Sequence, residues 1–538
     1  MSQKKLSGEQ SKLPKNSAQN KNRRRSKQNR SNSNSNKQFE EDFGTKETSA
    51  SNKIEWYARN QELLRSAASL PFSQTLGQRV YVPDTGGSFV VPGVLSIAWI
   101  PALGITGMND NGTPLYGSFP PSVDALNQAA NSVYSFVVHA NSRNTSYDAP
   151  DLLMVILAGG NVFSAIAMGI RVFGLMHRYD QQNLYTPRAL VEACGFDFED
   201  LQANLSKMWF DINNLVAMSS QIWIPNEFPL FERWFWMNTN VYADAESAKS
   251  QFYLFAQRRF YQFSETSSSQ GTALTPIEWD VSGTTSHTWD QYVSMVRTMI
   301  DALLGSQDRG IMFGDILKAY GPDKIYALSE VPINYTTPVV FDREVLTQIE
   351  NAQGVDLPLA SDLGFQQNVE KGVILHRVTP LEASASLQIS RVLPSAGVLN
   401  FHSKEVPTPE MVMVATRMKA MQDPSRNYGF GVPSVVGSEL LTRMNIWVSD
   451  PQGKPKSVAF TSARGDTTTI NEDWFKYWLA FDWAPWLYPV AVSGTAGNSS
   501  ITYRMPLGEW DQYTVVAAHD LAEMHNAAIY SELGVPML

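Results

Sequence analysis

The pattern of hydrophobic and polar positions along the chain predicts a body that is mainly α-helical with a smaller β content, an α+β fold. Three short runs typical of strands come first, at residues 79–82, 88–91 and 94–100, with a turn rich in Pro and Gly after the first run. Helical periodicity then dominates to about residue 260. The sequence therefore predicts a small hairpin region followed by a long helical stretch.

Capping residues mark the start of several predicted helices. Ser122 can cap a helix that runs to about residue 141, and Asp148 stands just before Pro150, a favourable residue for a first helical turn. Further helices are predicted from Pro187, over residues 197–218 and 290–304, from Thr408, and over residues 474–483 after Asn471. Residues 264–399 are less regular and contain clusters of Ser, Thr and Gly.

Two more elements follow from periodicity. In residues 382–390 apolar and polar side chains alternate, which is the pattern of a half-buried strand. The last predicted helix carries an apolar stripe at spacings of three and four, and Gly534 and Pro536 would end it. The stripe consists of Trp510, Tyr513, Ala517, Leu521, Met524 and Ala528.

The first 50 residues differ from the body in composition. They contain almost no aliphatic side chains and include a Ser-Asn repeat at residues 31–36. Such a segment cannot bury enough apolar surface to compensate for the entropy of ordering it. Residues 1–50 are therefore predicted to form a disordered arm, and the folded body to begin near residue 51.

Charge separates this arm from the body. Residues 1–37 contain eleven Lys and Arg against Glu9 alone, a net charge of +10, whereas the remaining residues carry 32 basic and 51 acidic side chains, a net charge of −19. A basic tail on an acidic body indicates a polyanionic partner. The basic residues of the arm are Lys4, Lys5, Lys12, Lys15, Lys21, Arg23, Arg24, Arg25, Lys27, Arg30 and Lys37.

The composition of the arm favours nonspecific binding of nucleic acid, and we expect these eleven side chains to contact RNA. Clustered Lys and Arg neutralise phosphates in any sequence context. No aromatic residue precedes Phe39, so stacking on bases is not expected. A solubilising or nuclear-targeting tail is the alternative interpretation of the same charges.

Residues 152–170 contain no charged side chain and approach the length of a membrane span, about 20 residues. Gly159, Gly160 and Ser164 lie in the middle of this segment, and nothing else in the chain resembles a companion span. A helix buried on all sides in a large protein has the same pattern. We favour the buried helix, with transient membrane contact as the alternative.

Motifs that an enzymatic mechanism would require are missing from the sequence. It has no phosphate-binding Gly-Lys-Ser/Thr loop, no His-Glu-x-x-His pair, no Gly-x-Ser-x-Gly elbow and no paired cysteines. His519 and His525 would point about 240° apart on a helix, which disfavours a shared metal. Cys194 lies among apolar neighbours, which favours a buried thiol. We expect no enzymatic activity, no metal and no cofactor.

Two short features bear on compartment and receptor. Because Cys194 is the only cysteine and no apolar leader follows Met1, synthesis in a reducing cytosol is expected. Arg464-Gly465-Asp466 lies between Ser and Thr residues, in an exposed-looking loop, and could bind an integrin. Three-residue matches are common by chance, so a receptor role is the weaker interpretation.

Aromatic residues are unusually dense at residues 228–236 and 474–488. Aromatic side chains are favoured in the cores of protein interfaces. We therefore predict that much of their area is buried between subunits of a dimer with two-fold symmetry.

Two runs carry a resemblance to a known family. Residues 187–197 have the sequence PRALVEACGFD, and residues 224–236 have the sequence IPNEFPLFERWFW. With the length, the basic arm and the helix-rich body, they make the chain similar to picobirnavirus capsid proteins from about residue 50 onward. A partitivirus-like coat protein, a non-viral RNA-binding scaffold and an unrecognised hydrolase are the alternatives.

The resemblance implies a virion protein, made in the host cytoplasm, that assembles as homodimers into an icosahedral shell around double-stranded genomic RNA. It implies a helical shell domain, assigned to residues 51–263 and 400–538, and a projecting domain, assigned to residues 264–399. The basic arm would face the RNA. Some family members resemble autoproteolytic precursors that perturb membranes, but no matching cleavage site can be placed here. The host receptor is not identified.

Overall fold

The computed structural model describes residues 58–67, 69–70, 74–103, 125–142, 145–178, 185–247, 249–265, 271–306, 308–354, 364–376, 394–403, 405–422, 433–460, 463–465, 476–495, 498–503 and 505–535. Contacts divide the chain into two units, Met1–Phe72 and Ser73–Leu538. In the first unit the structure describes one helix, α2 (Gln61–Ala67).

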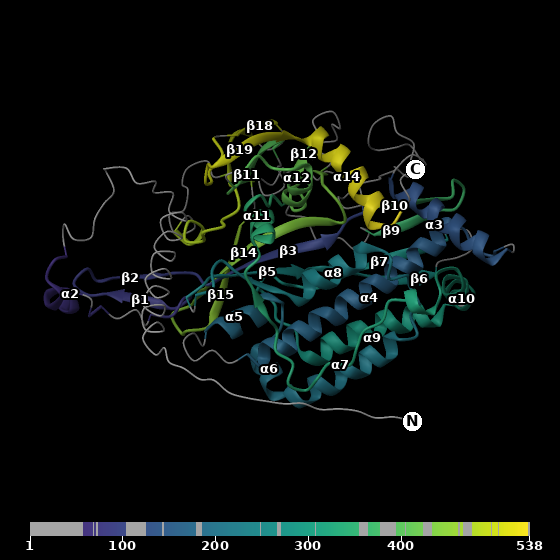
Figure 1. Cartoon of the computed structure of the whole chain (residues 1–538), viewed down its shortest axis with the longest axis horizontal. Coiled ribbons are helices and arrows are strands. Elements are labelled where there is room, and N and C mark those ends of the chain that lie inside the picture. The colour runs from purple at the N-terminus through teal and green to yellow at the C-terminus, as the bar shows by residue number, and fades with distance from the viewer. Residues whose placement is uncertain are drawn as a thin grey trace, which may run out of the picture. The chain divides into compact units, whose positions relative to one another are not determined.

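Helices and sheets are interleaved along the second unit (Figure 1). Its helices are α3 (Ala125–Asn141), α4 (Ala149–Met176), α5 (Tyr185–Ala193), α6 (Phe198–Ala203), α7 (Leu205–Ser219), α8 (Pro229–Thr239), α9 (Trp289–Gly305), α10 (Arg309–Tyr320), η3 (Pro322–Lys324), α11 (Arg343–Glu350), α12 (Pro409–Ala415) and α14 (Ala518–Glu532). Its strands are β1 (Arg79–Val82), β2 (Gly87–Val90), β3 (Val94–Pro101), β4 (Val241–Ala243), β5 (Phe252–Gln257), β6 (Arg259–Glu265), β7 (Thr272–Glu278), β8 (Val339–Val340), β9 (Phe365–Asn368), β10 (Val373–His376), β11 (Ala396–Phe401), β12 (Met421–Gln422), β13 (Pro433–Ser434), β14 (Glu439–Ser449), β15 (Pro455–Phe460), β16 (Ala463–Gly465), β17 (Tyr488–Thr495), β18 (Asn498–Tyr503) and β19 (Gln512–Ala517). This mixture confirms the predicted α+β class.

A six-stranded sheet joins distant parts of the chain, with strand order β15-β14-β3-β5-β4-β8. The strand β3 lies inside the sheet, antiparallel to β14 and parallel to β5. All eight of its residues are buried, as expected of a strand covered on both faces. The ladder between β3 and β14 is interrupted by an irregularity between Leu441 and Arg443.

The helix α4 is the centre of the helical layer. Asp148 is its N-cap and Pro150 lies in its first turn, as predicted. The helices α3, α7, α8 and α9 pack around it, which Figure 1 shows at the middle of the view. Gly160 and Gly169 permit the closest approaches, because a Cβ at either position would collide with Phe231 or Tyr292.

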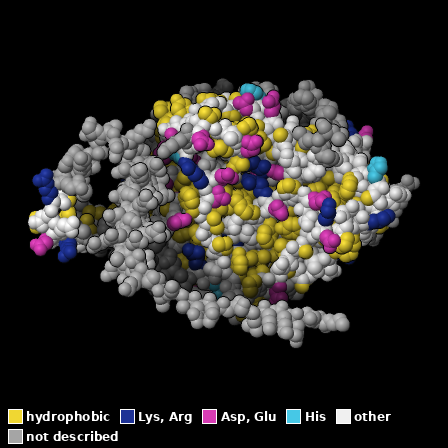
Figure 2. All heavy atoms as spheres, viewed as in Figure 1, with side chains coloured by type: hydrophobic (Ala, Val, Ile, Leu, Met, Phe, Trp, Pro, Cys, Tyr) yellow, Lys and Arg dark blue, Asp and Glu magenta, His cyan; other side chains and the backbone are white. Residues whose placement is uncertain are grey.

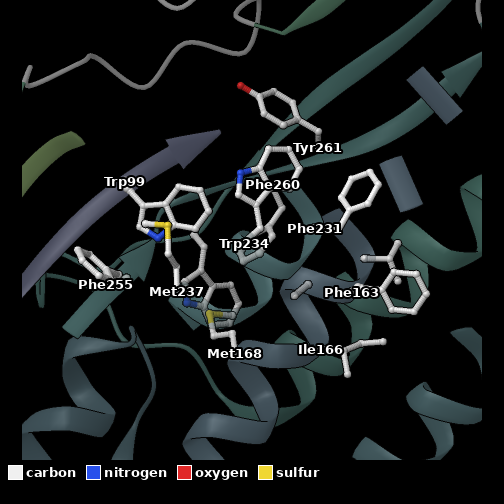
Figure 3. Packing of buried hydrophobic residues seen from close by; sticks show 14 of the residues in the cluster. Trp99, Phe163, Ile166, Met168, Phe231, Trp234, Met237, Phe255, Phe260 and Tyr261 are labelled. Atoms are coloured by element: carbon white, nitrogen blue, oxygen red, sulfur yellow. The ribbon is translucent and has the colours of Figure 1, made fainter. Parts of the chain in front are cut away.

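The main hydrophobic core forms where α4 meets α8 and the strands β3, β5 and β6. Trp99 of β3, Trp234 of α8 and Phe255 of β5 are each at most 1% exposed. Figure 3 shows these rings packed with Phe231, Met168 and their neighbours. Each fully buried side chain of this size contributes about 1.5–3 kcal/mol through removal of apolar area from water.

Several predicted elements are confirmed. The strands β1 to β3, the end of α3 at Asn141 and the helix α9 lie close to where the sequence places them. Thr408 caps α12, and its side chain accepts a hydrogen bond from the N–H of Met411. Ser122, the predicted strand at residues 382–390 and Asn471 lie outside the described residues.

Three predictions are wrong in detail. The last helix begins only at Ala518, because residues 512–517 form the strand β19, where Thr514-Val515-Val516 is a β-branched run that favours strand. The predicted helix over 197–218 is divided at Asn204 into α6 and α7.

The helical stretch predicted to extend to residue 260 ends at Thr239, the last residue of α8. Residues 241–265 instead form the strands β4, β5 and β6. The segment is dense in Phe and Tyr, which pack well in a sheet and favour strands over helices.

The less regular middle of the chain shares the main core. Trp289 and Tyr292 of α9 are fully buried in it, and Tyr292 donates a hydrogen bond of 2.9 Å to the carbonyl of Ala165 in α4. Contacts place all of Ser73–Leu538 in one unit. A division of the body at residues 264 and 399 therefore stays a prediction.

Candidate nucleic-acid interface and assembly surface

All eleven basic residues of the arm lie outside the described residues, so their RNA-binding role stays a prediction. They are Lys4, Lys5, Lys12, Lys15, Lys21, Arg23, Arg24, Arg25, Lys27, Arg30 and Lys37. What the structure provides is the electrostatic character of the body that the arm precedes.

Several basic side chains of the body are neutralised by neighbouring carboxylates. Arg188 forms an ion pair of 2.8 Å with Glu192 and a second one with Glu199. Lys207 pairs with Asp290 between α7 and α9. Figure 2 shows charges of both signs interspersed over the face in view. This arrangement offers no concentrated positive surface on that face, so attraction of a polyanion has to come from elsewhere.

Four charged side chains meet in the interior. Arg417 lies 2.7 Å from Glu439 on β14 and also pairs with Glu532 on α14, while Arg233 on α8 pairs with Glu439. Burial alone would raise the pKa of Glu439, but Arg233 and Arg417 hold it below its ordinary value. Burial raises the pKa of Glu532. This cluster links the last helix to β14 and α8, with its carboxylates buried and its two arginine side chains 12% and 18% exposed.

A second cluster surrounds His402. Its Nε2 lies 3.1 Å from Glu350 and 3.9 Å from Glu509, and its Nδ1 lies 3.4 Å from Asp511. The hydrogen bond to Glu350 raises the pKa of His402, with further contributions from the other carboxylates. Nearby, Lys419 donates to the carbonyl of Asn351 at 3.1 Å, and burial lowers its pKa to about 7.

The histidines and the cysteine singled out in the sequence have structural environments. On α14, His519 is exposed beside Asp520, whereas His525 is buried and its Nδ1 accepts the N–H of Gly437 at 3.1 Å. Cys194 is fully buried, and burial raises the pKa of its thiol. No group of three or more potential metal ligands occurs among the residues that the structure describes.

The apolar segment 152–170 lies within α4, and every one of its residues is buried. By length and composition α4 could cross a membrane, but the whole of its most apolar window is enclosed by protein. Some of the polar side chains of α4 have protein partners. Asn238 donates to Ser164 at 2.8 Å, and Arg171 donates to the carbonyl of Phe255 at 2.7 Å. The buried-helix interpretation is confirmed, and membrane contact would require α4 to leave the core.

The structure corrects two interpretations of the sequence, one about the Arg464-Gly465-Asp466 segment and one about the aromatic runs. Arg464 and Gly465 belong to the strand β16, paired with β17, rather than to a loop, and Asp466 lies outside the described residues. The aromatic runs also fail as interface markers, because Trp234 and Trp486 are at most 1% exposed within a single subunit. Large aromatic side chains serve the core as readily as an interface.

The exposed apolar residues that the structure does reveal include a set around β19. Tyr513 is 55% exposed, Val515 67% and the preceding Trp510 42%. Trp510 and Tyr513 belong to the apolar stripe predicted for the last helix, whereas Val515 does not. The uncharged, β-branched run over residues 512–517 was the signal that could have identified them.

Comparison with known proteins identifies the family. The family model for the picobirnavirus capsid protein matches residues 56–426. A capsid protein precursor of human picobirnavirus (strain Human/Thailand/Hy005102/-) is 27% identical over 520 residues, which cover 91% of this chain and 92% of that protein. The fold matches an X-ray crystallographic structure of the picobirnavirus capsid with a TM-score of 0.72 and 23% identity, over 89% of this chain and 98% of that one.

These matches agree with the resemblance carried by residues 187–197 and 224–236, and both runs lie inside the matched range. A capsid protein is a structural component of the virion, not an enzyme. The chain belongs to the picobirnavirus capsid protein family.

Proposed function

We propose that this chain assembles as two-fold symmetric dimers into an icosahedral shell, and that its basic arm holds double-stranded genomic RNA inside that shell. The observation that carries the proposal is the separation of charge, +10 on residues 1–37 against −19 on the remainder, in a chain of a capsid family. An acidic body repels a polyanion, so RNA near its inner surface needs a positive layer between them.

The ion pairs of the body support the assignment of RNA binding to the arm rather than to the body. Arg188 and Lys207 are already paired with carboxylates, so they have little free charge to offer to phosphates. The arm has eleven cations and one anion in 37 residues. Binding through these cations would be independent of RNA sequence.

The proposal extends to organisation and location. Residues 51–263 and 400–538 are assigned to the shell and residues 264–399 to a projection, with synthesis in the host cytoplasm. Contact with a host receptor or a membrane, and autoproteolysis of the N-terminal peptide, stay predictions of the resemblance.

The test is expression of the full chain and of a variant lacking residues 1–37. Electron microscopy should show closed, uniform particles for both, because the deletion removes almost no apolar area. The ratio of absorbance at nucleic-acid and protein wavelengths should be much lower for particles of the deleted variant. Soluble monomers of the full chain would refute the assembly proposal, and full RNA content without the arm would refute the packaging proposal.

A further inference from the structure

Among the residues that the structure describes, the strand β19 has a neighbouring strand on one side only, and backbone groups in the middle of its other side have no hydrogen-bond partner. It pairs with β11 in a two-stranded sheet, with Leu399 opposite Thr514. On β11 the N–H groups of Val398 and Asn400 are used on the far side, by Tyr488 at 3.0 Å and by Asn351 at 2.8 Å. The backbone N–H and C=O groups of successive residues in a strand point to opposite sides. Leu399 and Thr514 therefore form a hydrogen-bonded pair of the β11–β19 ladder.

The residues opposite Asn400 and Val398 therefore turn their backbone groups away from β11. These residues are Tyr513 and Val515. Among the described residues neither N–H has a hydrogen-bond partner, so β19 presents a free edge with two donors and two acceptors.

The β19 edge lacks the features that normally prevent an edge strand from pairing with another chain. Residues 512–517 contain no charge and no proline, and the ladder with β11 continues without a bulge. The side chains of Tyr513 and Val515 are 55% and 67% exposed. The ring of Trp510 lies 4.8 Å from that of Tyr513, which extends the apolar surface. Figure 1 shows β19 beside β11 near the margin of the unit, away from α4.

We propose that β19 pairs antiparallel with the β19 of a second copy of this chain, across a two-fold axis that passes beside Thr514. In this register Tyr513 lies opposite Val515 of the second copy, and the reverse pair lies on the other side of the axis. Each of these two pairs exchanges both backbone hydrogen bonds, and each joins an aromatic to a β-branched side chain, a favourable cross-strand combination. The strand is complementary to itself.

A second copy fits this edge better than other occupants do. An uncharged strand has no attraction for a polyanion, which argues against RNA. Pairing enlarges the isolated two-stranded β11–β19 sheet to four strands, and two-stranded sheets are marginal alone. The inference rests on the proposed self-assembly, in which every subunit meets copies of itself in closed symmetry.

The experiment is a cross-link at the axis. In the proposed register the two Thr514 residues form a non-hydrogen-bonded pair with Cα atoms about 4.5 Å apart, within the range of about 4.4–6.8 Å for a disulfide. The Thr514→Cys variant in assembled particles, treated with copper-phenanthroline, should run mainly as a covalent dimer on a non-reducing gel. The native Cys194 is fully buried and adds no background.

Met505→Cys is the matched control, because Met505 is 68% exposed and lies outside β19. Particles of Thr514→Cys with no more covalent dimer than Met505→Cys would overturn β19 pairing while leaving the capsid function intact. Failure of the wild-type chain to form particles would instead refute the proposed function.

A second pair of variants covers the case in which Thr514→Cys does not fold. Lysine on an edge strand disfavours pairing with another chain. Val515→Lys should therefore shift the sedimentation profile from dimer to monomer. Met505→Lys, which adds the same charge elsewhere, should sediment like wild type. Equal dimer content in both lysine variants would overturn the proposal, and so would binding of an unrelated protein at this edge without dimer formation.

Discussion

At the scale of single residues, the buried charge cluster shows how the end of the chain is held. Arg417 contacts Glu439 on one side and Glu532 on the other, and both carboxylates are buried, whereas the Arg417 side chain is 12% exposed. A buried charge that loses its partner keeps the full desolvation penalty without compensation. The guanidinium group of Arg417 therefore adds a polar attachment to the apolar packing of α14.

Arg417→Met should destabilise the folded chain by about 3–5 kcal/mol, because it leaves two buried carboxylates with fewer counter-charges. The measurement is the midpoint of chemical denaturation followed by tryptophan fluorescence. Lys207→Met is the control, since its ion pair with Asp290 is exposed and such pairs contribute little. Equal effects of the two substitutions would contradict this account of the cluster.

The pKa of His402 predicts a dependence on pH. Since its partners raise this pKa, the pairing stabilises the fold fully below the unfolded value of about 6.5 and is lost as the pH rises through the folded value. The difference in melting temperature between wild type and His402→Asn should therefore be largest in mild acid and shrink at alkaline pH. A difference that grows with pH would exclude the mechanism.

At the scale of elements, α4 is a long apolar helix that is closely packed by its neighbours. Its burial was predictable because an uncharged run of this length has few other stable environments in a soluble subunit. The helices that pack around it were predictable only as helices. Their contacts arise between residues far apart in the sequence, as with Tyr292 and Ala165.

Ala165→Asp should give insoluble protein, because Ala165 is fully buried and an aspartate there has no counter-charge, a penalty of several kcal/mol. Ala327→Asp provides the control at an exposed alanine. The soluble fraction after centrifugation and particle formation are the two measurements. Soluble particles of Ala165→Asp would mean that α4 is not enclosed as described.

The last helix shows where periodicity misleads. Apolar residues at spacings of three and four extend from Trp510 to Ala528, yet Tyr513 and Ala517 of this stripe lie in the strand β19, and Trp510 precedes it. A strand followed by a helix can satisfy the same spacing, and the run Thr514-Val515-Val516 carries the opposing preference. The pattern predicted α14 from Ala518 onward and missed the edge that precedes it.

Of the candidate interfaces, the basic arm was predictable from the sequence, whereas the β19 edge was not. The basic arm depends on composition alone, so it was evident from residues 1–37. The β19 edge and the Arg417 cluster depend on which distant strands and helices meet, and no local pattern encodes that. The aromatic runs were assigned to an interface because burial within a subunit and burial between subunits select the same side chains.

At the scale of the whole molecule, charge is divided between two segments, and this division makes a prediction about salt. Binding of RNA by the full chain should weaken steeply as salt rises, with a log-log slope of about −0.7 per neutralised phosphate on single strands. Replacing Arg23, Arg24 and Arg25 by Gln should reduce both the slope and the packaged RNA. Scrambling residues 1–37 at constant composition should change neither, and a loss of packaging on scrambling would contradict an electrostatic mechanism.

The pairing of β3 with β14 has a consequence for synthesis. Ser96 and Asn445, which face each other in this ladder, are 349 positions apart in the sequence. The ribosome has therefore released most of the chain before β3 can acquire its neighbour, and contacts of such long range form slowly. Until then the apolar surfaces of β3 and α4 lack part of their cover, and nascent subunits are vulnerable to aggregation. A chain truncated before β14 should therefore leave β3 without this neighbour and be more prone to aggregation than the full chain.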